Sequence, residues 1–105
     1  MKIAITSPNA KTISGHAGKC PGYLIYTIED NDQLDKTHIK LAKKDIFKNL
    51  VGLLSENPQH PLSEIKVFIT QSLGEGLLRR LKVDNINVIQ TQETDPEIAI
   101  NRLIK

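Results

Sequence analysis

The carboxyl-terminal half of the chain alternates between segments with strand spacing and segments with helix spacing, and this alternation restricts the fold most. Residues 65–70 (IKVFIT) form a short apolar segment rich in β-branched side chains, which is typical of a buried strand. A helix is predicted around residues 77–81, and a second strand at 86–90. A strand–helix–strand unit of this kind places its two strands parallel in one sheet, with a right-handed connection.

A last helix is predicted to begin within residues 94–97. Thr94 and Glu97 fit a capping box, and Asp95 followed by Pro96 would also cap the helix well. The apolar side of this helix is formed by Ala99, Ile100, Leu103 and Ile104.

The amino-terminal half contains three predicted strands, which would form an antiparallel meander. They lie at residues 2–6, 23–28 and 34–41, and a polar turn at 29–32 separates the second from the third.

A further helix is predicted between the meander and the strand at 65–70. Its apolar residues recur at the spacing of one helix face, and Pro58 would stop it because proline cannot continue a helix. The apolar face is formed by Ile46, Phe47, Leu50, Val51 and Leu54.

These elements predict one α/β domain over residues 1–105, with a five-stranded mixed sheet and three helices. The predicted order is strand, strand, strand, helix, strand, helix, strand, helix. This order resembles the ribonuclease H-like architecture.

Composition excludes several classes of protein. The formal charge of +2 and the presence of only two Tyr, two Phe and no Trp argue against a nucleic-acid-binding face. A single cysteine excludes an intramolecular disulfide and suits the reducing cytosol. No apolar run is long enough to cross a bilayer, so we expect a cytoplasmic protein without membrane contact.

The loop at residues 14–21 (SGHAGKCP) carries the most specific chemistry. His16 and Cys20 are the one pair of soft or borderline metal ligands close together in the sequence, and Gly15 and Gly18 permit close backbone approach. Two ligands cannot complete a structural zinc site or an ordinary iron–sulfur cluster, but they could hold a preassembled cluster reversibly. The alternative is that Cys20 is a small buried apolar residue and that His16 hydrogen-bonds the loop.

A second loop, at residues 71–76 (QSLGEG), follows the strand at 65–70 and opens a helix. Ser72 and Gly74 could face the first loop and contact an acidic part of a ligand. The alternative is a plain strand–helix turn.

The opening strand (MKIAI), the loop at 13–21 (ISGHAGKCP) and residues 24–26 (LIY) resemble the dinitrogenase iron–molybdenum cofactor-binding family. This family includes NifX-like and NafY-like domains and domains fused to the NifB radical enzyme. Its loop pattern is Gly-His-Phe-Gly-basic-Cys, and the chain departs from it at Ala17, where the family has Phe. The chain also has Gln71-Ser72 where the family commonly has Gly-Gly.

The resemblance implies a non-enzymatic carrier of an iron–sulfur or iron–molybdenum cluster. His16 and Cys20 would be the metal ligands. Its partners would be the cluster and a protein that donates or accepts it, and the chain would be a monomer or a homodimer. The implied cofactor-binding residues are Gly15, His16, Gly18, Cys20, Ser72 and Gly74.

Two other functions are open from the sequence. One is a regulatory protein-interaction domain of the same fold, acting through a sheet edge without metal. The other is a metal-dependent nuclease on a ribonuclease H-like scaffold, which is disfavoured because the strands at 2–6 and 65–70 carry no carboxylate to hold divalent ions.

Overall fold

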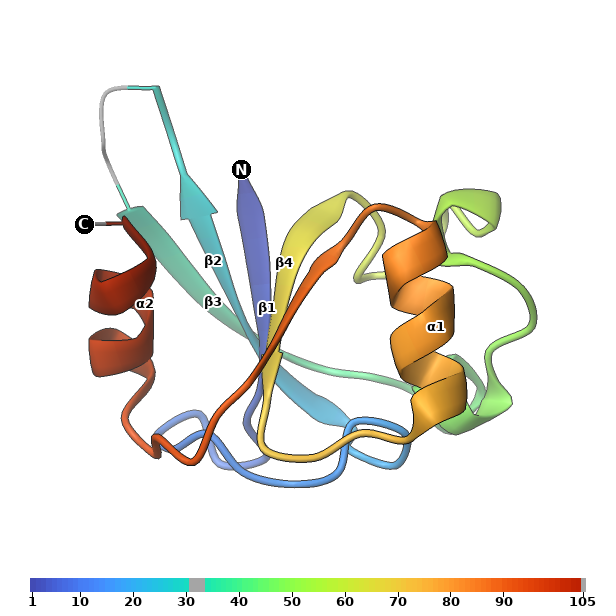
Figure 1. Cartoon of the computed structure of the whole chain (residues 1–105), viewed down its shortest axis with the longest axis horizontal. Coiled ribbons are helices and arrows are strands. Elements are labelled where there is room, and N and C mark those ends of the chain that lie inside the picture. Colours follow the sequence, from blue (N-terminus) through green and yellow to red (C-terminus); the bar gives the residue numbers. More distant parts are fainter. Residues whose placement is uncertain (31–33, 105) are drawn as a thin grey trace.

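A computed structural model describes residues 1–30 and 34–104 as one α/β domain built on a five-stranded sheet (Figure 1). The strands lie in the order β3-β2-β1-β4-β5. Their bounds are β1 Lys2–Thr6, β2 Gly22–Ile28, β3 Leu34–Lys40, β4 Ile65–Thr70 and β5 Asn87–Gln90.

The sheet is mixed, as predicted. The strands β1, β2 and β3 form the antiparallel meander, while β4 pairs parallel with both β1 and β5. Part of the turn predicted at 29–32 falls on residues 31–33, which lie outside the described residues.

Two helices cover opposite faces of the sheet, α1 (Glu75–Val83) and α2 (Pro96–Ile104) (Figure 1). Alternation along the central strands supplies both cores: Ala4 and Phe68 face the α1 side, while Ile5 and Ile69 face the α2 side. β1 and β4 are therefore buried on both faces, which explains their nearly continuous apolar sequences. In the described part of the chain, no helix is long and apolar enough to cross a membrane.

The helix predicted over residues 46–54 is wrong, so the residues that the structure describes form two α-helices instead of three. This region forms three short 3-10 turns, at Lys43–Asp45, Phe47–Asn49 and Leu54–Glu56. Between them the backbone is extended, and Gly52 takes a φ of +83°, a conformation that interrupts an α-helix.

Side chains from elsewhere replace the missing helical hydrogen bonds. The Arg80 guanidinium on α1 donates to the carbonyl oxygens of Leu50 at 3.0 Å and of Phe47 and Gly52 at 3.4 Å. The Asn57 amide donates to the carbonyl oxygens of Val51 and Leu53 at 3.0 and 2.8 Å. Phe47 and Leu54 are buried, as the apolar spacing predicts, but Val51 of the same predicted face is 86% exposed, and tertiary contacts decide the backbone conformation.

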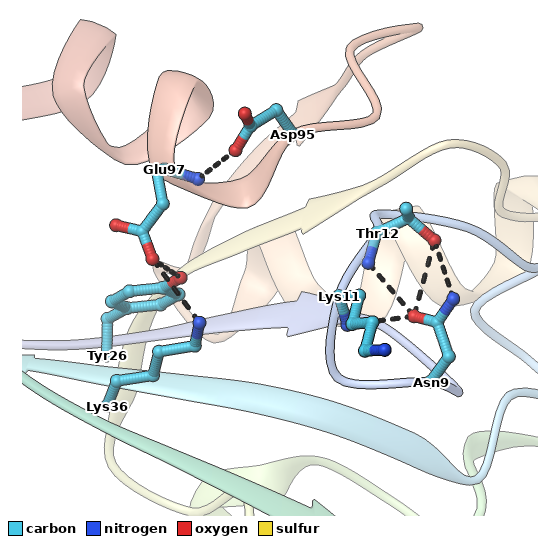
Figure 2. Close-up of polar contacts among 7 residues, drawn as sticks. All are labelled: Asn9, Lys11, Thr12, Tyr26, Lys36, Asp95 and Glu97. Atoms are coloured by element: carbon cyan, nitrogen blue, oxygen red, sulfur yellow. Dashed lines mark hydrogen bonds and ion pairs between the residues drawn. The ribbon is translucent and has the colours of Figure 1, made fainter.

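The amino-terminal end of α2 is capped by Asp95, whose Oδ1 accepts the Glu97 amide at 2.9 Å (Figure 2). The Glu97 carboxylate is thereby free for other contacts. Its Oε1 accepts the Tyr26 hydroxyl at 3.1 Å and the Lys36 ammonium at 3.3 Å, which ties α2 to β2 and β3 (Figure 2). Of the two caps predicted, the structure therefore uses Asp95 before Pro96.

Candidate metallocluster-binding site

The candidate site lies at the carboxyl ends of β1 and β4, the two neighbouring parallel strands at the centre of the sheet. Both strands end in a fully buried threonine, and the Thr6 hydroxyl donates to the Thr70 hydroxyl at 3.0 Å. Because parallel strands end at the same edge, the loops that follow them are neighbours. These are the loop that carries His16 and the loop that carries Ser72.

The two loops are joined by an isolated parallel bridge between His16 and Ser72. The Ala17 amide donates to the Ser72 carbonyl oxygen at 2.8 Å. The side chains meet as well, because His16 Nδ1 lies 2.7 Å from Ser72 Oγ. The second loop thus faces the first, and residues 56 positions apart form one structural unit.

The His16 side chain is exposed, and its second nitrogen, Nε2, lies near Gly18. A β-carbon on Gly18 would lie 3.8 Å from His16 Nε2, so the glycine leaves the space beside this nitrogen open. Gly15 takes a φ of +96°, which a residue with a side chain rarely adopts. Among the described residues, no hydrogen-bond partner is found for Nε2, so this atom is available to a ligand.

Cys20 lies in the core instead. Its side chain is 4% exposed and belongs to the α1-side core, and its thiol donates to the Gly22 carbonyl oxygen at 3.1 Å. Burial raises the pKa of the Cys20 thiol above its usual value, although hydrogen bonds with the backbone at Gly22 and Ser7 oppose the rise. The structure therefore brings His16 to the surface and leaves the Cys20 sulfur inside.

A tight turn explains why the two side chains separate. The amides of Lys19 and Cys20 both donate to the His16 carbonyl oxygen, at 3.0 and 2.9 Å. The Tyr23 hydroxyl donates to the Ala17 carbonyl oxygen at 3.1 Å, which holds the apolar side of this turn against the core. Ala17 is fully buried, so the position where the family has Phe packs inward in this chain.

Gly74 is the residue before α1 and is exposed, with nothing within 4 Å of a β-carbon built on it. Its carbonyl oxygen accepts the Leu78 amide at 3.1 Å, as in an ordinary helix start. Space does not require glycine here, but the open surface lets a ligand reach the end of the helix.

The other histidines do not join the site. His38 Nε2 lies 2.8 Å from the Ser7 carbonyl oxygen, and His60 is buried with Nε2 2.7 Å from the Asp45 carbonyl oxygen. Within residues 1–30 and 34–104, no group of three or more His, Cys, Asp or Glu residues could hold a metal ion. The candidate site thus offers one accessible imidazole rather than a complete coordination sphere.

Sequence reasoning included Ser72 but missed its contact with His16 and the threonine pair beneath it. The contact follows from the parallel pairing of β1 with β4, which brings the loops after them together and which no local sequence signal gives.

The fold is shared with solved structures of low sequence identity. A provisionally assigned dinitrogenase of Methanocaldococcus jannaschii has a TM-score of 0.71 at 19% identity, covering 99% of this chain and 88% of that one. A provisionally assigned NifB protein of Thermotoga has a TM-score of 0.60 at 14% identity, covering 98% of this chain and 86% of that one. None of the curated proteins compared matches the sequence significantly.

The sequence profile of a family described as dinitrogenase iron-molybdenum cofactor matches residues 1–105. This match spans the His16 loop, the Ser72 loop and every strand of the sheet. The family predicted from the opening strand and the glycine–histidine loop is thereby confirmed, and the chain belongs to the dinitrogenase iron–molybdenum cofactor family.

Proposed function

We propose that the protein is a non-enzymatic carrier that binds a preassembled iron–sulfur or iron–molybdenum cluster and passes it to a partner protein. His16 Nε2 is the accessible ligand, Gly18 gives the cargo room beside the ring, and Gly15 supplies the positive φ that the loop needs before His16. Ser72 anchors the ring from the second loop, and a further contact with the cargo is proposed at the exposed Gly74, the residue before α1. The ribonuclease H-like arrangement predicted for the sheet would serve here as a binding scaffold.

The observation that carries this proposal is the exposed imidazole of His16, anchored through Nδ1 to Ser72 at 2.7 Å. Imidazole is a ligand for iron, and an anchored ring orients its free nitrogen. In a chain of this family, such a group at the joint between two loops is the best-defined candidate contact with a cluster.

The metal-binding side chains of the candidate site fit a transiently carried cluster better than a permanently bound metal. A protein that builds a cluster site usually supplies four thiolates, whereas this chain has one cysteine, and that cysteine is buried. One accessible imidazole fits a cluster that brings its own ligands and binds weakly enough to leave.

Cys20 remains a predicted second ligand. To bind metal, its thiol would have to give up the bond to the Gly22 carbonyl oxygen and lose a proton that burial makes harder to remove. Binding through Cys20 would therefore require the loop at 14–21 to open.

The test is anaerobic mixing of the purified protein with an iron–sulfur cluster donor, followed by visible absorbance and native mass spectrometry. His16→Ala should lose most of the bound cluster, whereas His38→Ala, which removes another exposed histidine, should bind as wild type does. Cys20→Ser tests the second predicted ligand separately. If this variant loses as much bound cluster as His16→Ala does, the cluster also contacts the Cys20 thiol.

Equal cluster binding by wild type and by the His16→Ala, Cys20→Ala double variant would remove the carrier function. The regulatory domain would then be favoured, because β3 is an edge strand with six of its seven residues exposed. Capture of one stable protein partner by metal-free protein, lost on disruption of β3, would support that second function.

A further inference from the structure

The two nitrogens of the His16 ring lie in different surroundings. Nδ1 is 2.7 Å from Ser72 Oγ, while Nε2 lies on the Gly18 side of the ring with no hydrogen-bond partner among the described residues. A histidine without an anchor rotates and can offer either nitrogen to a metal, so this asymmetry has a chemical consequence.

Ser72 is itself held in place from beneath. Its carbonyl oxygen accepts the Ala17 amide at 2.8 Å and the Thr70 hydroxyl at 3.1 Å, and its amide lies 3.4 Å from Thr70 Oγ1. Thr70 Oγ1 in turn accepts the buried Thr6 hydroxyl at 3.0 Å. The Ser72 hydroxyl therefore projects from a backbone that the two central strands fix.

A hydroxyl is a suitable anchor because it both donates and accepts. In the metal-free protein it can serve either neutral tautomer of His16. When a metal binds Nε2, the ring proton resides on Nδ1, and Ser72 Oγ accepts it. The hydroxyl hydrogen is then released to donate to an electron-rich atom of the cargo.

We infer that Ser72 is a positioning residue that directs metal binding to Nε2 of His16. The nature of the cargo rests on the proposed function, whereas the choice of nitrogen is measurable with a simple metal ion.

The experiment uses Zn²⁺ as the probe and full-length protein with ¹⁵N-labelled histidine side chains. In wild type, Zn²⁺ should shift the Nε2 signal of His16 in the way metal coordination does, and leave Nδ1 protonated. Ser72→Ala should bind Zn²⁺ about tenfold more weakly, because loss of the hydrogen-bond partner of a metal-binding histidine lowers metal affinity by at least about that factor. This variant should also show coordination through Nδ1. Ser72→Thr keeps a hydroxyl and should restore both affinity and the choice of Nε2.

The buried His60 is an internal reference, because its Nε2 lies 2.7 Å from the Asp45 carbonyl oxygen and its Nδ1 accepts the Leu62 amide at 3.0 Å. Its signals should stay unchanged in every sample, which also verifies the fold of each variant.

Three results would overturn the assignment of Ser72: wild-type Zn²⁺ affinity through Nε2 in Ser72→Ala, no rescue by Ser72→Thr, or no response of His16 to Zn²⁺ in wild type. Failure of the proposed function looks different, because Zn²⁺ would still select Nε2 in a Ser72-dependent way while the cluster donor left no bound cluster.

Discussion

The backbones of Gly22 and Ser7 lie so close that a β-carbon on Gly22 would be 2.7 Å from the Ser7 carbonyl oxygen. The same atom would lie 2.8 Å from Pro8 Cα. The Ser7 amide donates to the Gly22 carbonyl oxygen at 2.9 Å, so this approach fixes the loop that leaves β1 against the start of β2.

Gly22→Ala should therefore destabilise the protein by about 2 kcal/mol or more, because the clash is with backbone and cannot be relieved by a side-chain rotation. Urea denaturation measures this change. Gly76→Ala is the matched control: nothing lies within 4 Å of its β-carbon, and alanine in helix α1 should add about 0.5 kcal/mol of stability. Equal effects of the two substitutions would contradict the close approach.

Arg80 replaces the hydrogen bonds of a helix that does not form. Its guanidinium donates to three carbonyl oxygens in residues 47–52, and it is only partly exposed. Arg80→Ala should cost about 2 kcal/mol, as expected when a charged donor is lost from partly buried acceptors, and amide exchange in 47–52 should accelerate.

The neighbouring Arg79 provides the control. Its side chain is 80% exposed and reaches Glu75 at 3.8 Å, so Arg79→Ala should change stability by less than about 0.5 kcal/mol. If Arg79→Ala were as costly as Arg80→Ala, a general effect of charge on α1 would explain both.

The raised pKa values of Tyr23 and Tyr26 predict that the protein loses stability in alkaline solution. Burial raises the pKa of Tyr23, with the neighbouring Cys20 adding to the effect, and burial together with Glu97 raises the pKa of Tyr26. The folded state thus holds these protons more tightly than the unfolded chain, whose tyrosines titrate near pH 10. Stability from this source is complete below about pH 10 and falls as the pH rises further.

The urea midpoint between pH 8 and pH 11 measures this fall, and tyrosinate absorbance should appear together with unfolding. Tyr23→Phe and Tyr26→Phe should each flatten the pH dependence. An unchanged slope in both variants would assign the fall to other groups.

The Cys20 thiol should resist alkylation in the folded protein. Because it is 4% exposed and burial raises its pKa, iodoacetamide at pH 8 should modify it on the order of 100-fold more slowly than in strong denaturant. Mass spectrometry over time measures the rate. Rapid modification without denaturant would show that the loop at 14–21 opens readily, which would favour Cys20 as a metal ligand.

The strands were predictable because their local patterns and their burial agree. The predicted ranges 2–6 and 65–70 match β1 and β4, and the remaining strands differ by at most one residue at either end. The helix predicted over 46–54 is wrong because apolar spacing carries no information about the positive φ of Gly52 or about the hydrogen bond from Arg80, thirty residues from Leu50.

The sequence predicts which residues form the candidate site, and this stays a prediction, but it does not give the geometry of these residues. Glycines around a histidine and a cysteine identified the loop, but spacing alone does not say on which side of the backbone each side chain falls. The turn that gathers two amides on the His16 carbonyl oxygen sends the imidazole outward and the thiol inward. The contact with Ser72 depends on strand pairing, which no local pattern encodes.

The bridge between His16 and Ser72 joins a segment near the start of the chain to one that is completed only after β4. An amino-terminal fragment would carry the histidine without its anchor, and any fluctuation that detached β4 from β1 would undo the pair. Under the proposed function, retention of the cargo at His16 would therefore be thermodynamically linked to the pairing of β1 with β4, and local unfolding of that pair would release it.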